Sequence, residues 1–471
     1  MSPHSPTPPF PDQRLPTSEA EATMTMLTPH DPRTGRPRPA YQAAREKGVT
    51  ATVDAAAAAQ RGWASLLPGQ RSRRLLRLAD RIEDRAEEYA AALRAGTGKP
   101  EEEARGEVAG SADVLRFYAG AARTESSPAA GRRMADRESW VRWEPLGVVA
   151  AIVPWNYPLM MAMWRLGPAL AAGNTVVLKP AETTPDTALL LGEDAAGLLG
   201  DDVVCVLPGD RETGALLVDS RVDAVAFTGS TVGGLDVAYR AGLRPVSLEL
   251  GGNCAALVLP DAPAHTCASL AAASVFNAGQ SCAAPARVIT LPENHDAVVE
   301  GLAREMGRKV AGVDFGPLNN ADQAARYDHI LSASRAGVRH NGRIEPGPEC
   351  EGGYWRPPVV LADLADDDPA VLEEVFGPLL TVQRARDLEH AVELANGVPQ
   401  ALAASVWSSD VSSALTLAGR LDAGEAWVNC HLDQTPELPH GGRKSSGHGT
   451  DLSALALAEY QRPKCVTVRL G

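Results

Sequence analysis

The sequence predicts an α/β protein, with a parallel sheet in one domain and a second α/β domain after it. Short apolar runs alternate with helical segments from residue 147 onward, and this alternation is typical of βαβ units and a buried parallel sheet. A second alternating region covers residues 262–441 and indicates the second α/β domain. Before both, residues 53–122 show the three- and four-residue spacing of amphipathic helices.

The apolar runs give the expected order of strands and helices. In the first region we expect strands at residues 147–153, 174–178, 203–207, 222–227, 246–250 and 255–259. Helical patterns lie between the first five of these, at 160–172, 187–199, 212–218 and 235–241. In the second region we expect strands near 287–291, 379–383, 403–407 and 426–429. Ligands of such folds bind at the carboxyl ends of parallel strands, so the side chains there are the first candidates for a site.

The composition excludes several classes of protein. The chain has 471 residues, enough for two or three domains. Its 45 basic and 59 acidic residues give a net charge of −14, which does not suit a nucleic acid or an anionic membrane as a partner. Seven cysteines without a CxxC pair favour a reducing compartment. The sequence shows neither a membrane span nor a signal peptide, so we expect a cytoplasmic protein.

The N-terminal segment differs in composition from the rest. Ten of the 36 prolines lie within residues 1–39, and proline-rich segments favour extended, poorly buried chain. Residues 1–38 are therefore predicted to form a mobile arm. A proline-rich ligand for a recognition domain is the alternative, although no clean PxxP array is present.

Two strand ends carry candidate groups for a nucleotide. The turn after the fourth strand places Gly229, Ser230 and Gly234 at the start of a helix, where backbone amides can meet a pyrophosphate. A glycine turn capped by Ser230 explains the same residues without a ligand. Lys179 and Glu182 follow the second strand, and Glu182 is placed to accept hydrogen bonds from ribose hydroxyls. A surface ion pair is the alternative there.

A cysteine and a buried acid are the candidates for chemistry. Cys282 follows a flexible glycine turn, and a free thiol is a good nucleophile toward a carbonyl group if it is oriented. Glu249 lies among leucines and glycines at the end of a strand, so burial would raise its pKa toward that of a useful base. This makes it a better candidate base than His265, the nearest histidine.

Other catalytic patterns are missing from the sequence. His431, His440 and His448 are separated by nine and eight residues, which is no known metal spacing, so no metal is predicted. Neither GxSxG nor GK[ST] occurs, and GxGxxG is absent after the first strand. A serine hydrolase, a P-loop protein and a plain Rossmann protein are therefore not indicated.

Six motifs in one order carry a family resemblance. They lie at 154–158 (PWNYP), 179–182 (KPAE), 227–231 (FTGST), 248–252 (LELGG), 279–282 (GQSC) and 373–378 (EEVFGP). In this order they resemble the NAD(P)-dependent aldehyde dehydrogenase superfamily, and the likeness extends from about Asp31 to the C-terminus. The resemblance implies an aldehyde dehydrogenase-like fold, with a Rossmann-like cofactor domain, an α/β catalytic domain and a small β oligomerisation element.

The resemblance also implies domain boundaries and an assembly. Residues 39–125 and 147–252 would form the NAD-binding domain, and residues 253–440 the catalytic domain. Residues 126–146 and 441–471 would form the oligomerisation element of a homodimer or homotetramer.

Roles in the reaction follow from the resemblance. Cys282 would attack the aldehyde, and the Asn156 amide together with the Cys282 backbone N–H would hold the oxyanion. Glu249 would activate water to release the acid from the thioester. Glu182 would repel a 2′-phosphate, which favours NAD over NADP as the cofactor. The implied cofactor-binding residues are Ile152, Trp155, Lys179, Glu182, Gly229, Ser230, Gly234, Glu374 and Phe376.

The substrate is expected to be a small aldehyde. Residues 428–431 and 437–442 look most like those of aminobutyraldehyde dehydrogenases, close to betaine aldehyde dehydrogenases, so an ω-amino or guanidino aldehyde such as 4-aminobutanal is implied. Asp433 and Glu437, with Tyr157 and Trp164 as aromatic walls, would suit the cation, and a solvated loop with two acids is the alternative. The expected pocket residues are Tyr157, Trp164, Ser281, His431 and Asp433.

Several departures from the family pattern keep other substrates open. Ser281 stands where aminoaldehyde enzymes usually carry an acid, Asn253 replaces a common lysine, and Val232 and Gly233 replace an acid and an aliphatic residue. A neutral aldehyde or a semialdehyde is therefore an alternative substrate. A CoA-acylating dehydrogenase and a non-catalytic scaffold are the alternative functions.

Overall fold

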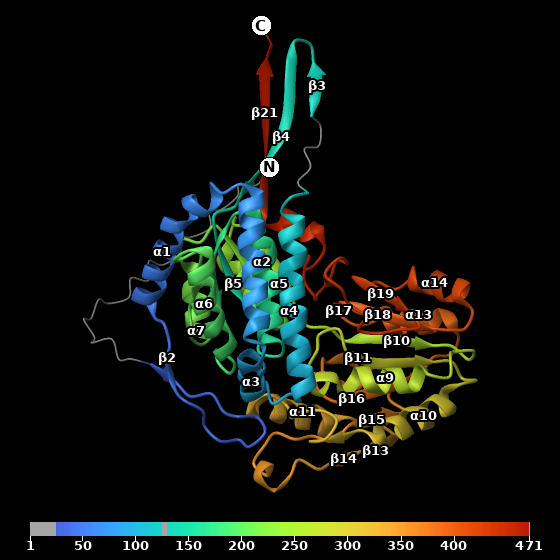
Figure 1. Ribbon diagram of the computed structural model, residues 1–471. Helices are drawn as coiled ribbons and strands as arrows, with labels where there is room; N and C mark the ends of the chain where they lie inside the picture. Colours follow the sequence, from blue (N-terminus) through green and yellow to red (C-terminus); the bar gives the residue numbers. More distant parts are fainter. Residues whose placement is uncertain (1–24, 125–129, 471) are drawn as a thin grey trace, which may run out of the picture.

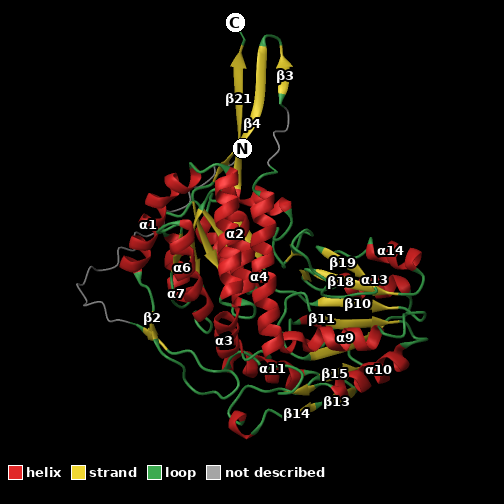
Figure 2. Ribbon diagram, in the orientation of Figure 1, coloured by secondary structure: helices red, strands yellow, loops and turns green. Residues whose placement is uncertain are grey.

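A computed structural model describes residues 25–124 and 130–470 of the chain (Figure 1). It contains a five-stranded sheet, a seven-stranded sheet and a narrow three-stranded sheet that projects from the body (Figure 2). The predicted alternation of strands and helices is confirmed in both large sheets. No helix among the described residues is long and apolar enough to span a membrane.

The five-stranded sheet is entirely parallel, with the strand order β7-β6-β5-β8-β9. Strand order reverses between β6 and β8, on either side of β5, and ligands bind at such switch points in open α/β sheets. The strands are β5 (Val148–Ile152), β6 (Thr175–Lys179), β7 (Val204–Val206), β8 (Ala224–Thr228) and β9 (Val246–Glu249).

Alternate side chains of these strands enter two different cores. Val149 and Ala151 of β5 pack in one core with α2 to α6, whereas Val148 and Ala150 pack in another with α1, α7 and α8. Both faces of the sheet are therefore covered, as the continuous apolar runs predict. The helices are α1 (Glu46–Ala64), α2 (Pro68–Asp84), α3 (Ala86–Thr97), α4 (Glu101–Ala121), α5 (Pro158–Ala172), α6 (Asp186–Leu199), α7 (Arg211–Asp219) and α8 (Thr231–Ala241).

The seven-stranded sheet has the order β13-β15-β16-β11-β10-β18-β19, and only the edge strand β13 is antiparallel. Helices α9 and α10 cover one face, and α13 and α14 cover the other. The elements are β10 (Cys254–Val258), α9 (Thr266–Val275), β11 (Pro285–Thr290), α10 (His295–Arg308), α11 (Ala321–Ala333), β13 (Val338–Asn341), β15 (Val359–Ala362), α12 (Pro369–Leu372), β16 (Leu379–Arg384), α13 (Leu388–Asn396), β18 (Ala403–Trp407), α14 (Val411–Ala418) and β19 (Glu425–Val428).

The projecting sheet joins two distant parts of the chain. Strand β4 (Arg137–Pro145) pairs along its whole length with β21 (Gln461–Arg469), and β3 (Gly131–Met134) pairs with the other edge of β4. No helix covers this sheet in Figure 1. Residues 441–460, predicted to belong with it, instead lie on the body: β20 (Arg443–Lys444) pairs with β17 (Gln400–Ala401), and the 3-10 helix η3 (Ala454–Tyr460) ends in the core.

The predicted mobile arm, residues 1–38, is wrong for residues 25–38, and its residues 1–24 lie outside the described residues. Strand β1 (Met26–Leu27) pairs with β2 (Tyr41–Gln42). The Tyr354 N–H donates to the Pro32 carbonyl at 2.9 Å, and the Trp355 indole donates to the Arg33 carbonyl at 3.0 Å. Backbone hydrogen bonds to distant segments fix this part of the chain, and its proline content does not reveal them.

Candidate active site

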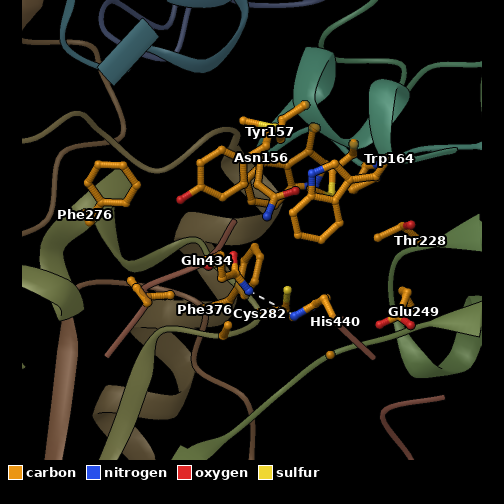
Figure 3. Close-up of a pocket in the computed structure, with 18 of the residues that line it drawn as sticks. Asn156, Tyr157, Trp164, Thr228, Glu249, Phe276, Cys282, Phe376, Gln434 and His440 are labelled. Carbon is orange, nitrogen blue, oxygen red and sulfur yellow. Dashed lines mark hydrogen bonds between the residues drawn. The ribbon is translucent and has the colours of Figure 1, made fainter. Parts of the chain in front are cut away.

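A cavity of about 1290 Å³ lies between the two large sheets (Figure 3). Helices α4 and α5, the start of α8, the end of β9 and several loops of the second sheet line it. The structure brings eleven of the predicted site residues to this one cavity: Trp155, Asn156, Tyr157, Trp164, Gly229, Ser230, Glu249, Ser281, Cys282, Glu374 and Phe376.

A strained turn carries Cys282 into the cavity. After α9 the chain forms the 3-10 helix η1 (Phe276–Gly279), in which Asn277, Ala278 and Gly279 have φ values of 50°, 56° and 71°. Left-handed backbone is costly for a residue such as alanine. A Cβ at Gly279 would lie 2.2 Å from the Gly377 carbonyl oxygen, so only glycine fits there.

The Cys282 thiol is half-buried beside a second thiol and two acids. Burial raises the pKa of Cys282 well above its ordinary value, and the neighbouring Cys254, Glu374 and Glu249 raise it further. The Cys254 thiol donates to the Cys282 carbonyl at 3.3 Å. A Cβ at Gly252 would lie 2.0 Å from that carbonyl oxygen, which explains the glycine there. The thiol is therefore neutral at pH 7 and becomes a strong nucleophile only when it loses its proton.

Asn156 is held beside the nucleophile turn by hydrogen bonds. Its side-chain Nδ2 donates to the Gln280 carbonyl at 3.0 Å, which leaves the second amide hydrogen free. The backbone carbonyl of Asn156 accepts from the Asn277 side-chain amide at 3.0 Å and from Lys99 Nζ at 3.1 Å. The amide thus has a hydrogen available for an oxyanion in the cavity that Asn156 lines.

The sequence reasoning missed the buried ion pair behind Asn156. Lys99 and Glu107 form an ion pair in which both side chains are almost fully buried. Glu107 also accepts from the backbone N–H groups of Leu159 and Met160, which begin α5. The two residues are eight positions apart around the start of α4, a spacing that carries no signal of its own because only tertiary packing brings the pair to Asn156.

Glu249 is an unpaired buried carboxyl group. It ends β9, and neither of its side-chain oxygens has a hydrogen-bond partner among the described residues. Burial raises the pKa of Glu249 well above its ordinary value, the nearby Asp451 raises it further, and Arg165 lowers it. An acid in this state can hold a proton at neutral pH and can exchange it with a water molecule in the cavity.

A second buried ion pair, Arg165 with Asp451, lies close enough to Glu249 to affect its pKa. This pair was not predicted from the sequence either. Arg165 of α5 contacts an oxygen of Asp451 at 2.8 Å, and both side chains are almost fully buried. Arg165 also donates to the Thr228 and Ser247 hydroxyl groups at 2.7 and 3.1 Å. The pair joins α5 to the C-terminal loop and to the strands that end at the cavity.

Another part of the cavity carries aromatic groups and the start of α8. The Trp155 and Phe376 rings meet edge to face at 5.5 Å. Ser230 caps α8 by accepting from the Gly233 N–H at 3.2 Å. The Glu374 carboxylate accepts from the Gly252 N–H at 2.9 Å, and burial raises the pKa of Glu374 to about 7.

The remaining four predicted cofactor residues, Ile152, Lys179, Glu182 and Gly234, do not line the cavity. They lie at or near the carboxyl ends of the strands of the five-stranded sheet. Lys179 and Ile152 are register neighbours at the ends of β6 and β5. Lys179 Nζ lies 3.6 Å from the half-exposed Glu182 carboxylate, and burial lowers the pKa of Lys179. Gly234 in α8 packs against Leu250, where a Cβ would meet the leucine at 2.5 Å.

Aromatic rings form the walls of the rest of the cavity. Tyr157 stacks with Phe276 at 6.4 Å, and Trp164 meets His440 edge to face at 5.1 Å (Figure 3). Ser281 lies beside the Tyr157 hydroxyl. Phe276 was missed, although its place just before the nucleophile turn is a signal for it.

The structure places two predicted pocket residues outside the cavity. His431 is buried behind Cys282: its Nε2 donates to the Ala283 carbonyl at 2.9 Å, and its Nδ1 contacts the Ser405 hydroxyl at 2.8 Å. Burial lowers the pKa of His431 to about 4, so the ring is neutral. Asp433 is exposed and does not line the cavity. The direction of a loop side chain depends on the turns before it, which the sequence does not show.

Residues 18–466 match the model of the aldehyde dehydrogenase family. The chain belongs to the aldehyde dehydrogenase family. It is 34% identical to betaine aldehyde dehydrogenase of Bacillus subtilis (strain 168), covering 90% of this chain and 89% of that one. An aldehyde dehydrogenase of Aspergillus niger is 35% identical over 94% and 91% of the two chains. A solved betaine aldehyde dehydrogenase from Staphylococcus aureus, in complex with NAD+, has a TM-score of 0.90 at 26% identity, covering 95% of this chain and 92% of that one.

This aldehyde dehydrogenase is therefore an NAD-dependent enzyme, and its residues fit the cofactor. The eleven-residue helix α8 begins at the cavity, and its free N-terminal amides suit a pyrophosphate. A Cβ at Gly229 would meet the Phe227 ring at 2.7 Å, so the turn before α8 is open only because glycine occupies it.

Because burial raises the pKa of Cys282 well above its ordinary value, we expect alkylation of this residue by iodoacetamide to speed up about tenfold per pH unit from pH 7 to 9. Peptide mass spectrometry of timed digests measures the rate, with the exposed Cys465 in the same digest as an internal reference and Cys282→Ala as the blank. A rate that reaches a plateau below pH 8 would contradict this account of the thiol.

Proposed function

We propose that the enzyme oxidises an aldehyde to the free carboxylic acid through a covalent thioester on Cys282. The observation that carries this proposal is that Cys282, Asn156 and Glu249 line one cavity, with the Glu249 carboxyl group unpaired. A nucleophile, an oxyanion donor and a base are the groups that acyl transfer to water requires.

The residues act in a defined order. Cys282 gives its thiol proton to a water molecule in the cavity, and its sulfur bonds to the aldehyde carbon while the carbonyl electrons move to oxygen. The Asn156 amide hydrogen and the Cys282 backbone N–H hold that oxyanion. After oxidation to the thioester, Glu249, once it has released its own proton to solvent, takes a proton from water, whose oxygen bonds to the acyl carbon. The carbon–sulfur bond breaks, and Cys282 leaves as the thiolate.

Residues at the sheet edge hold the cofactor in this proposal. Ser230 and the α8 amides bind the pyrophosphate, and Lys179 with Glu182 binds the adenosine ribose. Glu374 and Phe376 contact the nicotinamide end. When bound, NAD accepts the hydride that leaves the substrate carbon. The Glu182 carboxylate repels a 2′-phosphate, which favours NAD over NADP.

A cationic aldehyde is the substrate that the charges around the cavity favour. Glu102, Glu103 and Asp113 of α4 line it, and the one Lys or Arg side chain among the described lining residues is Arg326, which bonds to the Glu374 carbonyl at 3.0 Å. Aromatic walls can contact an ammonium group through their faces. We therefore propose an ω-amino or guanidino aldehyde such as 4-aminobutanal. The acids of α4 take the place of the predicted Asp433 and Glu437, neither of which lines the cavity.

The uncovered sheet supports an oligomer. A three-stranded sheet with both faces open lacks a core of its own, and Trp140 and Val468 on it are 36% and 42% exposed. Pairing with a second copy of the chain would bury these side chains. We propose that the enzyme assembles through this sheet as a homodimer or homotetramer.

The Glu249→Gln variant should accumulate the acylated enzyme. It keeps thioester formation and loses the base that activates water, so we expect about one NADH per active site in a burst, followed by turnover slowed about 10²- to 10⁴-fold. Stopped-flow absorbance at 340 nm measures both phases. The exposed surface acid Glu437, changed to glutamine, serves as the control. Steady turnover within about threefold of the wild type would exclude Glu249 as the base.

The substrate proposal predicts an order of kcat/KM at equal chain length. We expect 4-aminobutanal to exceed butanal by about tenfold, because cation contacts with acids and aromatic faces contribute on the order of 1 kcal/mol. Succinic semialdehyde should fall below butanal, because its carboxylate meets like charges. Initial rates of NADH formation give the comparison. If butanal equals or exceeds 4-aminobutanal, the substrate is not a cationic aldehyde, and the dehydrogenase mechanism stands.

The assembly proposal predicts that charge on the projecting sheet dissociates the oligomer. In a Trp140→Glu, Val468→Glu double variant, two carboxylates would be buried at the proposed interface, so we expect a smaller sedimenting species in analytical ultracentrifugation. A Leu235→Glu, Tyr239→Glu double variant on α8 is the comparison, because it adds the same charge at two exposed positions elsewhere. An unchanged sedimentation coefficient for the double variant would exclude this sheet from the assembly.

A further inference from the structure

One polar side chain in the aromatic part of the cavity has no role in the proposed reaction. His440 lines the cavity beside Trp164 and is 2% exposed (Figure 3). Its backbone N–H donates to the Asp451 carbonyl at 2.8 Å, and its carbonyl accepts from the Asp451 N–H at 2.7 Å. These two hydrogen bonds fix where the imidazole enters the cavity.

Glu425 determines which ring nitrogen of His440 carries a hydrogen. The Nδ1 atom lies 2.9 Å from Oε2 of Glu425, at the start of β19, and this carboxylate also accepts from the Gln434 side-chain amide at 3.2 Å. The Gln434 Nε2 atom also lies 3.0 Å from Nδ1, but its amide hydrogens have the Glu425 carboxylate as the stronger acceptor. A carboxylate can only accept, so Nδ1 donates to it. The remaining nitrogen, Nε2, makes no hydrogen bond within the described part of the chain. In the neutral ring it is an acceptor with a free lone pair.

The charges around this imidazole favour a hydrogen-bond donor as its ligand. Glu425 contacts it directly, and Asp451 lies close enough for a charge interaction with it. Glu249 follows along the same wall, with an oxygen about 3.3 Å from a Cβ built on Gly441. The nearest base in this cluster, Arg165, is already paired with Asp451. A carboxylate on the substrate would therefore meet acids here, whereas an N–H or O–H group would meet a lone pair.

We propose that His440 selects aldehydes whose chain carries a hydrogen-bond donor, an ammonium or a hydroxyl group, by accepting that hydrogen at Nε2. The inference rests on the proposed oxidation of a short aldehyde in this cavity. Recognition of the substrate's charge and recognition of its hydrogen-bond donor then belong to different residues. The acids of α4 respond to the charge of the substrate, and His440 responds to its N–H or O–H group. Gln434 and Glu425 are positioning residues, because they act through His440.

Four aldehydes of similar length separate charge from hydrogen bonding. 4-Aminobutanal carries both, 4-(trimethylammonio)butanal carries charge without a donor, 4-hydroxybutanal carries a donor without charge, and pentanal carries neither. The kcat/KM of each is measured with the wild type and with His440→Phe, which keeps an aromatic ring of similar size. His448→Phe is the matched control, because His448 is exposed on the same C-terminal segment and does not line the cavity.

In the His440→Phe variant we expect two ratios to fall about tenfold: 4-hydroxybutanal to pentanal, and 4-aminobutanal to 4-(trimethylammonio)butanal. His448→Phe should leave both ratios at the wild-type values. Glu425→Gln gives a second test that keeps the imidazole. Its amide can donate to Nδ1 and shift the hydrogen to Nε2, so both ratios should fall about threefold.

Equal losses for all four aldehydes in His440→Phe would overturn the proposal, since they would show a role in packing alone. Losses confined to the two cations would also overturn it, since they would show a role in charge. If the wild type prefers pentanal to both cations, the proposed substrate class fails. The ratio of 4-hydroxybutanal to pentanal still decides the role of His440 in that case.

Discussion

The carbonyl oxygen of Asn156 is the point at which the two domains are held together around the reacting atoms. Lys99 reaches it from the part of the chain that packs on the five-stranded sheet, and Asn277 reaches it from the turn before Cys282, beside the seven-stranded sheet. The Asn156 side chain returns a hydrogen bond to Gln280. A shift of the turn at 277–280 away from Asn156 would break the buried hydrogen bonds with Asn277 and Gln280, and each broken one leaves an unsatisfied polar group. The proposed oxyanion donor, Asn156, and the proposed nucleophile, Cys282, are therefore held in a fixed relation.

Burial of acidic groups is the second constraint on the site. Desolvation raises the pKa values of Cys282, Glu249 and Glu374, because burial disfavours the charged form of each group. A neutral thiol is protected from adventitious reagents, and a protonated Glu249 avoids repulsion with its acidic neighbours. The same burial strengthens a hydrogen bond to a developing oxyanion, because little water competes for it.

The wall that carries His440 and Glu249 belongs to the C-terminal segment and to the end of β9. Two backbone contacts join these segments. Glu249 and Gly447 form an isolated antiparallel bridge, and the Leu250 N–H donates to the Ser446 carbonyl. The proposed base, Glu249, and the imidazole that we assign to selection are thus supported by one piece of backbone. Recognition and hydrolysis in this enzyme depend on the same local packing.

The sequence by itself determined most of the elements, and together with the family resemblance it marked the proposed reacting groups. Apolar periodicity located both sheets, because each strand is buried on two faces, and short motifs marked Cys282, Glu249 and Asn156 because turns with glycine and proline leave local signals. Only the tertiary structure decided the supporting groups. Lys99 and Glu107 meet Asn156 through packing of α4 on α5, and residues 25–38 are held by a distant loop. The His431 side chain is hydrogen-bonded to the Ala283 carbonyl and lies outside the cavity, whereas His440 lines the cavity. Contacts between segments far apart in the chain set each of these outcomes, and no local pattern encodes them.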